Sequence, residues 1–385
     1  METLYHQIKF RQGDVHQICN RPYRRVWLSH TLIPVTAWFV LALALASLAF
    51  AQGTPEIVWQ ADNASKAIAF SPDGKMLLSG NQLRQVSDGT VIRTFTLPRT
   101  GQGINTVAIS PDAQFAAIGV QLFNQNLDLF RVADGSLVAG PISAHDNGTG
   151  SVAFSPDGQL LASAGKGGAK LWHVPDMTLI RTIPRPSRCD GVAVVAFSSD
   201  GQLLAAGGCG VQLFRVADGT LVRTLNGSAD ASRSVAFSPD GQNIAAGSAF
   251  TDASGQCVDC SIKLWRLFDG ALLRTIDGNN NGINSIAFAP DGRFIADGSS
   301  ARSYNGVVRF WRLSDGMLVR YFNQDPNNVY SFINNVAYSP NGSLFAYERG
   351  DFRVVVARNP LSATPSLACI NQLRSLIAQR LGLMR

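Results

Sequence analysis

Four cysteines of this 385-residue chain have spacings that permit sulfur chemistry. Cys257 and Cys260 form a Cys-Val-Asp-Cys pair, whereas Cys189 and Cys209 flank two β-prone runs. Such thiols form disulfides in oxidising compartments, act as redox pairs beside βαβ units, or bind zinc in two pairs. No βαβ pattern and no second Cys-x-x-Cys accompany residues 257–260. We therefore predict disulfides for these two pairs, with free or redox thiols and a zinc site as alternatives.

Other residues capable of catalysis or metal binding are scarce. Only His145 and His173 lie beyond residue 30, and neither has a partner at a spacing that suggests catalysis. Residues 277–282, DGNNNG, match the first half of a calcium loop, but its twelfth position is Phe288, where a bidentate glutamate is required. We expect no catalytic residue, no metal and no cofactor.

The charge balance excludes an electrostatic site for nucleic acid. The net charge is +6, but residues 1–51 hold five basic and two acidic side chains, which leaves 28 basic against 25 acidic beyond them. An excess of three over the remaining chain forms no basic patch. With 46% hydrophobic residues and 36 glycines, the composition indicates a turn-rich globular β protein.

Residues 31–51 contain no charge and follow the basic cluster Arg21, Arg24 and Arg25. Such a stretch enters a bilayer, and Ala-Phe-Ala at 49–51 has the small-x-small pattern of a signal-peptidase site. We predict that residues 1–51 are a signal peptide, with an uncleaved membrane anchor as the alternative. Both interpretations place the rest of the chain outside the cytoplasm, periplasmic or secreted in the first case and membrane-anchored in the second.

The elements that must position any site come from one phrase that recurs seven times. Its copies are AIAFSPDG at 67–74, TVAISPDA at 106–113, SVAFSPDG at 151–158, VVAFSSDG at 194–201, SVAFSPDG at 234–241, SIAFAPDG at 285–292 and NVAYSPNG at 335–342. Their spacing of roughly 40 to 50 residues is typical of four-stranded propeller blades. Each unit also reads as four β runs joined by Pro, Asp and Gly turns, which favour hairpins.

These units predict an all-β fold, a seven-bladed β-propeller of four-stranded antiparallel blades over residues 52–360. The seventh unit has only three strands before Asn359-Pro360, whereas residues 56–60, EIVWQ, precede the first unit. We predict that this N-terminal strand closes the last blade, because closure hides strand edges. Residues 361–385 form a separate amphipathic helical tail in this interpretation.

The runs KLWHV at 170–174, KLWRL at 263–267 and RFWRL at 309–313, together with the S-P-D-G turns, resemble the repeats of the bacterial WD-repeat β-propeller family. The resemblance implies a rigid platform for protein binding and not an enzyme. The chain departs from the family pattern, because His or Arg follows Trp172, Trp265 and Trp311 where Asp is usual. We therefore expect the buried His, Ser, Trp, Asp hydrogen-bond network of that family to be absent.

The longest insertions predict where a partner binds. Connections between blades, and between second and third strands, emerge on one rim, and long loops on a repeat platform encode binding. The candidate binding residues in them are Asp252, Arg302, Tyr304, Asp325 and Tyr330. We expect an extracytoplasmic scaffold with a protein partner, no nucleic acid, and membrane contact through residues 31–51. The alternatives are a hydrolase- or lactonase-type propeller enzyme at the central channel and an anchored sensor.

Overall fold

The computed structural model describes residues 51–52, 54–62, 67–99, 103–184, 194–225, 227, 232–251, 257–278, 282–300, 306–323 and 332–362. All described strands belong to one compact unit, Phe50–Pro360. The predicted leader, 31–51, and the tail, 361–385, lie almost entirely outside the described residues. Within the described part no helix has the length and apolar character needed to cross a membrane.

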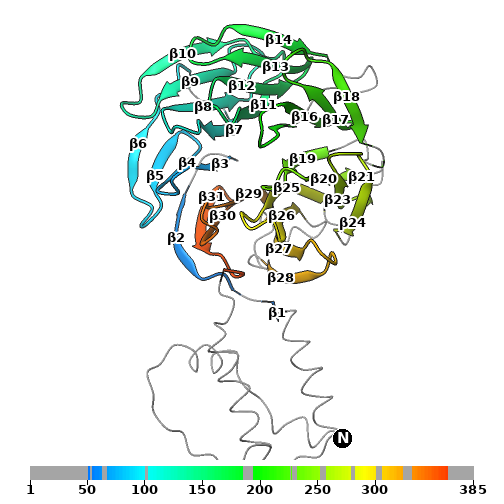
Figure 1. Ribbon diagram of the computed structural model, residues 1–385. Helices are drawn as coiled ribbons and strands as arrows, with labels where there is room; N and C mark the ends of the chain where they lie inside the picture. The colour runs from blue at the N-terminus through cyan, green and yellow to red at the C-terminus, as the bar shows by residue number, and fades with distance from the viewer. Residues whose placement is uncertain are drawn as a thin grey trace, which may run out of the picture. The chain divides into compact units, whose positions relative to one another are not determined.

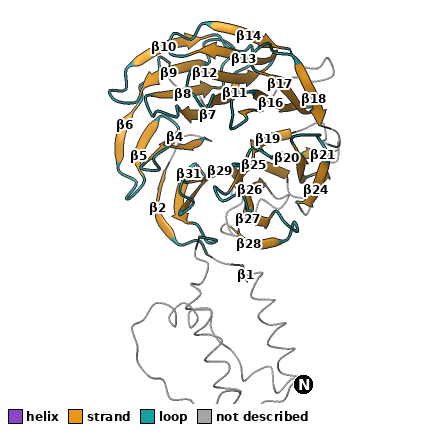
Figure 2. Ribbon diagram, viewed as in Figure 1, coloured by secondary structure: helices purple, strands orange, loops and turns teal. Residues whose placement is uncertain are grey.

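Seven sheets arranged in a ring form the unit, and the described chain consists of strands and turns (Figures 1 and 2). The fold prediction is confirmed, because each repeat forms one antiparallel blade. The strands of the first four blades, from the centre outward, are β3 (Ile68–Phe70), β4 (Met76–Ser79), β5 (Gln82–Gln85), β6 (Val91–Thr94); β7 (Ile104–Ile109), β8 (Phe115–Val120), β9 (Leu127–Arg131), β10 (Leu137–Ile142); β11 (Thr149–Phe154), β12 (Leu160–Gly165), β13 (Gly168–His173), β14 (Leu179–Ile183); and β15 (Val194–Phe197), β16 (Leu203–Gly208), β17 (Gly210–Arg215), β18 (Leu221–Leu225). The remaining blades contain β19 (Ser232–Phe237), β20 (Asn243–Ser248), β23 (Ser261–Arg266), β24 (Leu272–Asp277); β25 (Gly282–Phe288), β26 (Phe294–Ser300), β27 (Val307–Arg312), β28 (Leu318–Asn323); and β29 (Ile333–Tyr338), β30 (Leu344–Arg349), β31 (Arg353–Arg358).

The ring closes through the N-terminal strand β2 (Ile57–Asp62), as predicted from residues 56–60. It pairs antiparallel with β31, so that Trp59 lies opposite Val356, and becomes the outer strand of the seventh blade. A second N-terminal strand, β1 (Ala51–Gln52), was not predicted. It pairs in parallel with β28 and adds a fifth strand to the sixth blade.

The S-P-D-G turns hold the first and second strands of the blades together at one end of the ring, called the turn rim here. In the third blade the Ser155 hydroxyl donates to Asp157 at 2.5 Å and accepts the Leu160 amide at 2.9 Å. Asp157 also accepts the Gln159 amide at 3.1 Å. The same contacts recur with Ser71, Ser110, Ser198, Ser238 and Ser339. Each turn therefore satisfies its own backbone groups without help from the partner blade.

Neighbouring blades are latched together at the same rim by arginines of the outer strands. Arg223 of β18 donates to the carbonyl oxygens of Asp269, at 2.5 Å, and Phe268, at 3.4 Å, in the next blade. Gly270 in that turn has φ +72°, and a Cβ there would lie 2.4 Å from Arg223 Cδ. The latch recurs with Arg93, Arg181 and Arg274. The Asp-Gly turn therefore needs glycine both for its backbone and for the neighbour's arginine.

At two contacts between blades another residue takes the place of the latch arginine. Ala139 of β10 takes the arginine's place, and the facing turn has buried Met177 at φ 55° instead of glycine, so an apolar contact forms. At the closure of the ring, the Trp59 indole donates to the Val86 carbonyl at 2.7 Å and its ring covers Gly89. The closing strand thus makes a buried version of the same latch.

The apolar core lies between the blades. One cluster joins Leu78, Leu83 and Phe95 of the first blade to Ile118 and Phe130 of the second, and the Phe95 and Phe130 ring centroids are 5.3 Å apart. Because each sheet is covered on both faces, its middle strands are almost continuously apolar, as the sequence indicated. The blades are therefore a rigid support for their connections.

Candidate functional site

The end of the ring opposite the turn rim is called the insertion rim here, because second and third strands are joined there and one blade passes to the next. All five candidate binding residues predicted for this rim lie outside the described residues, namely Asp252, Arg302, Tyr304, Asp325 and Tyr330. Cys189 also lies outside them. The described part of the rim must therefore be evaluated on other side chains.

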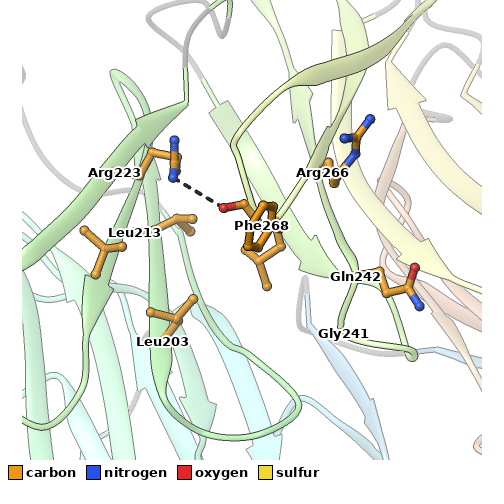
Figure 3. Close-up of a pocket in the computed structure, with 9 residues that line it drawn as sticks. Leu203, Leu213, Arg223, Gly241, Gln242, Arg266 and Phe268 are labelled. Carbon is orange, nitrogen blue, oxygen red and sulfur yellow. Dashed lines mark hydrogen bonds between the residues drawn. The ribbon is translucent and has the colours of Figure 1, made fainter.

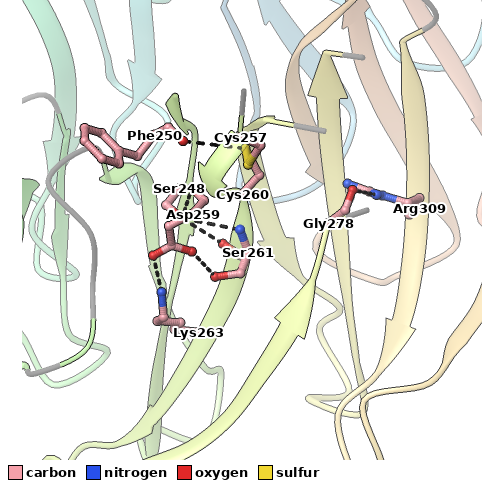
Figure 4. Close-up of a disulfide and its surroundings, with 9 residues drawn as sticks. All are labelled: Ser248, Phe250, Cys257, Asp259, Cys260, Ser261, Lys263, Gly278 and Arg309. Carbon is pink, nitrogen blue, oxygen red and sulfur yellow. Dashed lines mark hydrogen bonds and ion pairs between the residues drawn. A yellow bond between two sulfur atoms is a disulfide. The ribbon is translucent and has the colours of Figure 1, made fainter. Parts of the chain in front are cut away.

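A small hairpin projects from the insertion rim between the second and third strands of the fifth blade (Figure 4). Its strands are β21 (Phe250–Thr251) and β22 (Cys257–Asp259), and a disulfide joins Cys257 to Cys260 at its base. Cys209, in the corresponding connection of the fourth blade, is also disulfide-bonded. The structure thus has disulfides, not free thiols, at the three predicted cysteines that it describes.

Asp259 anchors this hairpin to the blade. Lys263 donates to its carboxylate, and the Ser261 hydroxyl does so at 2.5 Å. Burial raises the pKa of Asp259, but the hydrogen bonds from Lys263 and Ser261 outweigh burial, and the pKa lies below its ordinary value. Asp259 is therefore a structural anion and not a proton donor at neutral pH.

Three large apolar side chains on the insertion rim are exposed to solvent. Phe123 is 71% exposed in the connection between β8 and β9, Val258 is 60% exposed in β22, and Phe352 is 52% exposed between β30 and β31. Phe352 also has φ 61°, a left-handed conformation that costs a bulky residue about 1–3 kcal/mol. These side chains come from three different blades, and all three lie in connections between second and third strands.

The inner strands carry β-bulges where they begin at the insertion rim. Five of them skip one residue in their pairing with the second strand. The bulge residues are Asn105, Gly150, Arg233, Asn284 and Asn334. Bulges re-aim side chains and are common beside binding sites. Three asparagine amides, one arginine and one glycine thus occur at the ends of the inner strands, and these five residues are called the bulge ring here.

Hydroxyl groups just beyond the bulges tie four of the inner strands to the next blade. The Val152 amide donates to Thr106 at 3.1 Å, and the Ile286 amide donates to Ser234 at 3.0 Å. Ser151 and Ser285 accept the corresponding amides of Val195 and Val336. The bulge ring therefore has a fixed backbone beneath it.

Buried polar networks behind the rim correct in part the prediction that the His, Ser, Trp, Asp network is absent. His145 Nε2 lies 2.8 Å from the Ser163 hydroxyl oxygen, which accepts the Trp172 indole N–H at 2.9 Å. The His, Ser, Trp network is thus present in the third blade. Burial lowers the pKa of His145 to about 4, so the ring is neutral at neutral pH. The pair Ala144-His145 was the sequence signal for it, although its glycine is replaced.

The sixth blade forms a different network at the same positions. Asp297 lies where Ser163 lies in the third blade, opposite Arg309 on the neighbouring strand. It accepts the Trp311 indole N–H at 2.5 Å and two guanidinium N–H groups of Arg309. A third nitrogen of Arg309 donates to the Gly278 carbonyl at 2.6 Å. Because this buried charge pair is internally satisfied, it supports the blade and is not a reactive site.

A second buried pair joins the first two blades. Arg99 donates to Asp128 at 2.6 Å, and Asp128 has no exposed surface. Burial raises the pKa of Asp128 to about 6, and the Arg99 charge opposes but does not cancel this effect. At neutral pH Asp128 is therefore still largely ionised and paired with Arg99, but it takes up a proton more readily than an ordinary carboxylate.

An apolar groove of about 530 Å³ lies at the turn rim between the fourth and fifth blades (Figure 3). Leu203, Leu213 and Val222 line one side, while Phe268 lies on the other and is 89% exposed. Other blades have Ser, Ala or Pro at the position of Phe268. The phenylalanine before Asp269-Gly270 was the sequence signal for this groove, and sequence reasoning missed it.

The described residues contain no group of three or more His, Cys, Asp or Glu side chains able to hold a metal ion. The charge pairs behind the rim are buried, whereas the exposed groups at the rim include apolar, amide and guanidinium side chains as well as Lys166 and the carboxylates of Asp62, Asp146 and Asp277. Such an arrangement can bind another molecule. The hydroxyl that lies beside a histidine in the described part of the chain, Ser163 with His145, is buried and out of reach of a substrate.

Comparisons with known proteins agree with the architecture. Residues 55–93, 136–173, 219–266 and 270–312 match the WD domain, G-beta repeat family. The chain is similar to an uncharacterized WD repeat-containing protein of Synechocystis sp., with 31% identity over 122 residues, 30% of this chain. It spans about a third of the length of that relative, 34%. A chain in the crystal structure of the mitotic checkpoint complex shares the fold, with a TM-score of 0.64, 19% identity and coverage of 80% of this chain and 95% of that one.

Proposed function

We propose that this β-propeller, whose repeats match the WD40 family, a class that commonly binds proteins, is an extracytoplasmic scaffold that binds a protein through its insertion rim. The observation that carries the proposal is the exposure of Phe123, Val258 and Phe352 on that rim. Single exposed apolar residues are ordinary, but these three occupy the same connection in three blades. Aromatic and aliphatic anchors on a rigid support are typical of binding surfaces.

The other described connections between second and third strands on this rim lack exposed large apolar side chains. Second and third strands are joined by Gly80-Asn81 in the first blade, Lys166-Gly167 in the third and Cys209 in the fourth. None of these short connections exposes a large apolar side chain. The longer connections, which tolerate insertion, are therefore the ones that carry apolar groups.

The scaffold interpretation is favoured over a propeller enzyme by the inner strands. Their described parts contain amide, hydroxyl and apolar side chains and one arginine, but no Asp, Glu or His. A hydrolase or a metal-assisted lactonase needs acidic or histidine side chains at the channel. WD40 propellers are also usually non-catalytic.

The proposed location outside the cytoplasm rests on the uncharged stretch 31–51 behind a basic cluster and on the disulfide at Cys257 and Cys260. Mass spectrometry of the protein isolated from its native host tests it. We expect either a mature N-terminus directly after residue 51 or an intact leader in the membrane fraction. An intact chain recovered only from the soluble cytoplasmic fraction would contradict the location.

Site-specific photocrosslinking in the native host tests the binding surface. A photoreactive amino acid replaces Phe123, Val258 or Phe352 in turn, and the matched controls carry it at Phe268 on the turn rim or at exposed Ile180 on an outer strand. We expect the three insertion-rim positions to crosslink to the same protein and the controls not to do so. Equal crosslinking from all five positions, or none from the insertion rim, would contradict the proposal.

A further inference from the structure

Arg233 is the one charged residue in the described parts of the seven inner strands. It is a bulge residue of β19 and is exposed at the insertion rim. The equivalent bulge positions of other inner strands carry Asn105, Gly150, Asn284 and Asn334, which are neutral. The bulge ring therefore has a single positive charge among amide groups.

A neighbouring amide orients the Arg233 guanidinium. One of its nitrogens donates to the Asn284 side-chain oxygen at 3.0 Å, and the Asn284 side-chain nitrogen donates to the Ile333 carbonyl at 2.9 Å. The two bonds link the fifth, sixth and seventh blades. A flip of the Asn284 amide would break both hydrogen bonds. The amide therefore has one orientation, and it holds Arg233 in one direction.

Arg233 has no carboxylate partner in the described part of the chain. Other described arginines at the insertion rim or just behind it are paired with acids, since Arg99 contacts Asp128, Arg309 contacts Asp297, Arg349 contacts Asp351 and Arg353 contacts Asp62. Arg233 contacts a neutral amide, so none of the described carboxylates compensates its charge. A guanidinium presents five N–H donors in a fixed plane that matches a carboxylate.

We propose that the bulge ring binds a carboxylate of the partner protein through Arg233, with Asn284 as a positioning residue. This inference rests on the proposed scaffold function and identifies the chemistry that the partner presents to the ring. The amides of Asn105 and Asn334, at equivalent bulges of other inner strands, suit a polar peptide backbone, because amides both donate and accept hydrogen bonds. The carboxylate comes either from an acidic side chain or from a C-terminus.

Isothermal titration calorimetry of the full chain at low ionic strength tests the proposal with three peptides. The first is a hexaglutamate capped at both ends, the second is a capped hexaglutamine, and the third is a hexaglutamine with a free C-terminal carboxylate. The variants are Arg233→Gln and Asn284→Asp, the second of which places a carboxylate beside Arg233. The control is Arg353→Gln, which removes an exposed arginine of β31 that lies 3.4 Å from Asp62 and causes the same change in net charge.

We expect hexaglutamate to bind and capped hexaglutamine not to bind. Arg233→Gln should weaken hexaglutamate binding about tenfold or more, because a hydrogen-bonded charge pair is lost. Asn284→Asp should weaken it similarly, whereas Arg353→Gln should have less than a twofold effect. Binding of the hexaglutamine that has a free carboxylate would support the inference and assign the site to a C-terminus.

The proposal is overturned if neither carboxylate peptide binds, or if Arg233→Gln and Arg353→Gln weaken binding equally. An equal effect would mean that the peptide responds to net charge and not to the bulge ring. Such a failure is distinguishable from failure of the scaffold function, because photocrosslinking at Phe123, Val258 and Phe352 does not depend on Arg233.

Discussion

The latch between Arg223 and the turn at Gly270 gives a sharp prediction about stability. Gly270→Ala introduces a Cβ that would lie 2.4 Å from Arg223 Cδ and 3.1 Å from its Nε. Gly292→Ala is the matched control, because Gly292 has a similar φ of +68° against +72° and nothing within 4 Å of its added Cβ. The two variants share the backbone strain and differ in the contact with the neighbouring blade.

The expected magnitudes follow from these two parts. A left-handed alanine costs about 1–2 kcal/mol, of which about 0.4–1 kcal/mol is recovered through the lower entropy of the unfolded chain. Gly292→Ala should therefore cost about 1 kcal/mol. Gly270→Ala also displaces Arg223 from the carbonyls of Asp269 and Phe268, which adds about 1 kcal/mol for these exposed hydrogen bonds. Its total is about 2 kcal/mol.

Urea denaturation of the full chain, followed by tryptophan fluorescence at constant m-value, measures these differences. Arg223→Ala alone should cost about 1 kcal/mol, and adding it to Gly270→Ala should cost nothing further, because the latch is already lost. Two results would refute the reasoning. One is an equal cost for Gly270→Ala and Gly292→Ala, and the other is strict additivity of Gly270→Ala with Arg223→Ala.

Three further changes test the ring and its networks. Trp59→Ala should lower the unfolding free energy by about 3–5 kcal/mol in urea denaturation, because it removes a buried side chain and the closing latch; a cost below 1 kcal/mol would mean that β2 does not close the ring. Ser163→Ala should lower the unfolding free energy by about 1–3 kcal/mol in urea denaturation, since the Trp172 indole N–H and His145 lose their shared partner; an unchanged urea midpoint would rule out the network. Hydrogen bonds from Thr220 lower the pKa of Asp218 to about 2, so its stabilisation is complete above the unfolded-state pKa near 4 and is lost as the pH falls toward 2. Asp218→Asn should make the urea midpoint depend less on pH over that range. An unchanged dependence of the midpoint on pH would contradict the assignment.

The repeat architecture could be predicted from the sequence because it depends on local chemistry. Each S-P-D-G turn satisfies its own hydrogen bonds, and β runs that are apolar throughout must be covered on both faces. Seven such units in phase leave few arrangements other than a ring. Closure by residues 56–60 followed from counting strands, because the seventh unit lacked one. The cysteine pair at 257 and 260 was visible for the same reason, since three residues of separation bring the two thiols together.

Contacts between blades could not be read in the same way. Arg223 and Gly270 are 47 positions apart, and only the ring brings the outer strand of one blade onto the turn of the next. The prediction that the His, Ser, Trp, Asp network is absent did not hold for three of its members in the third blade, because it rested on the identity of flanking residues. His145 and Ser163 meet through the fold although Gly precedes no histidine here. Asp297 illustrates the same limit, because only the folded structure shows that it occupies the place of Ser163 and pairs with Arg309.

The sequence by itself thus determined the number of blades, their strand order and the strand that closes them, because hairpin geometry and burial act over a few residues. The tertiary structure decided which side chains meet across blades and which remain exposed on the rims. Phe123, Phe268 and Arg233 look ordinary in the sequence. Their exposure and their partners become defined only when the inner strands, the bulges and the neighbouring blades are in place.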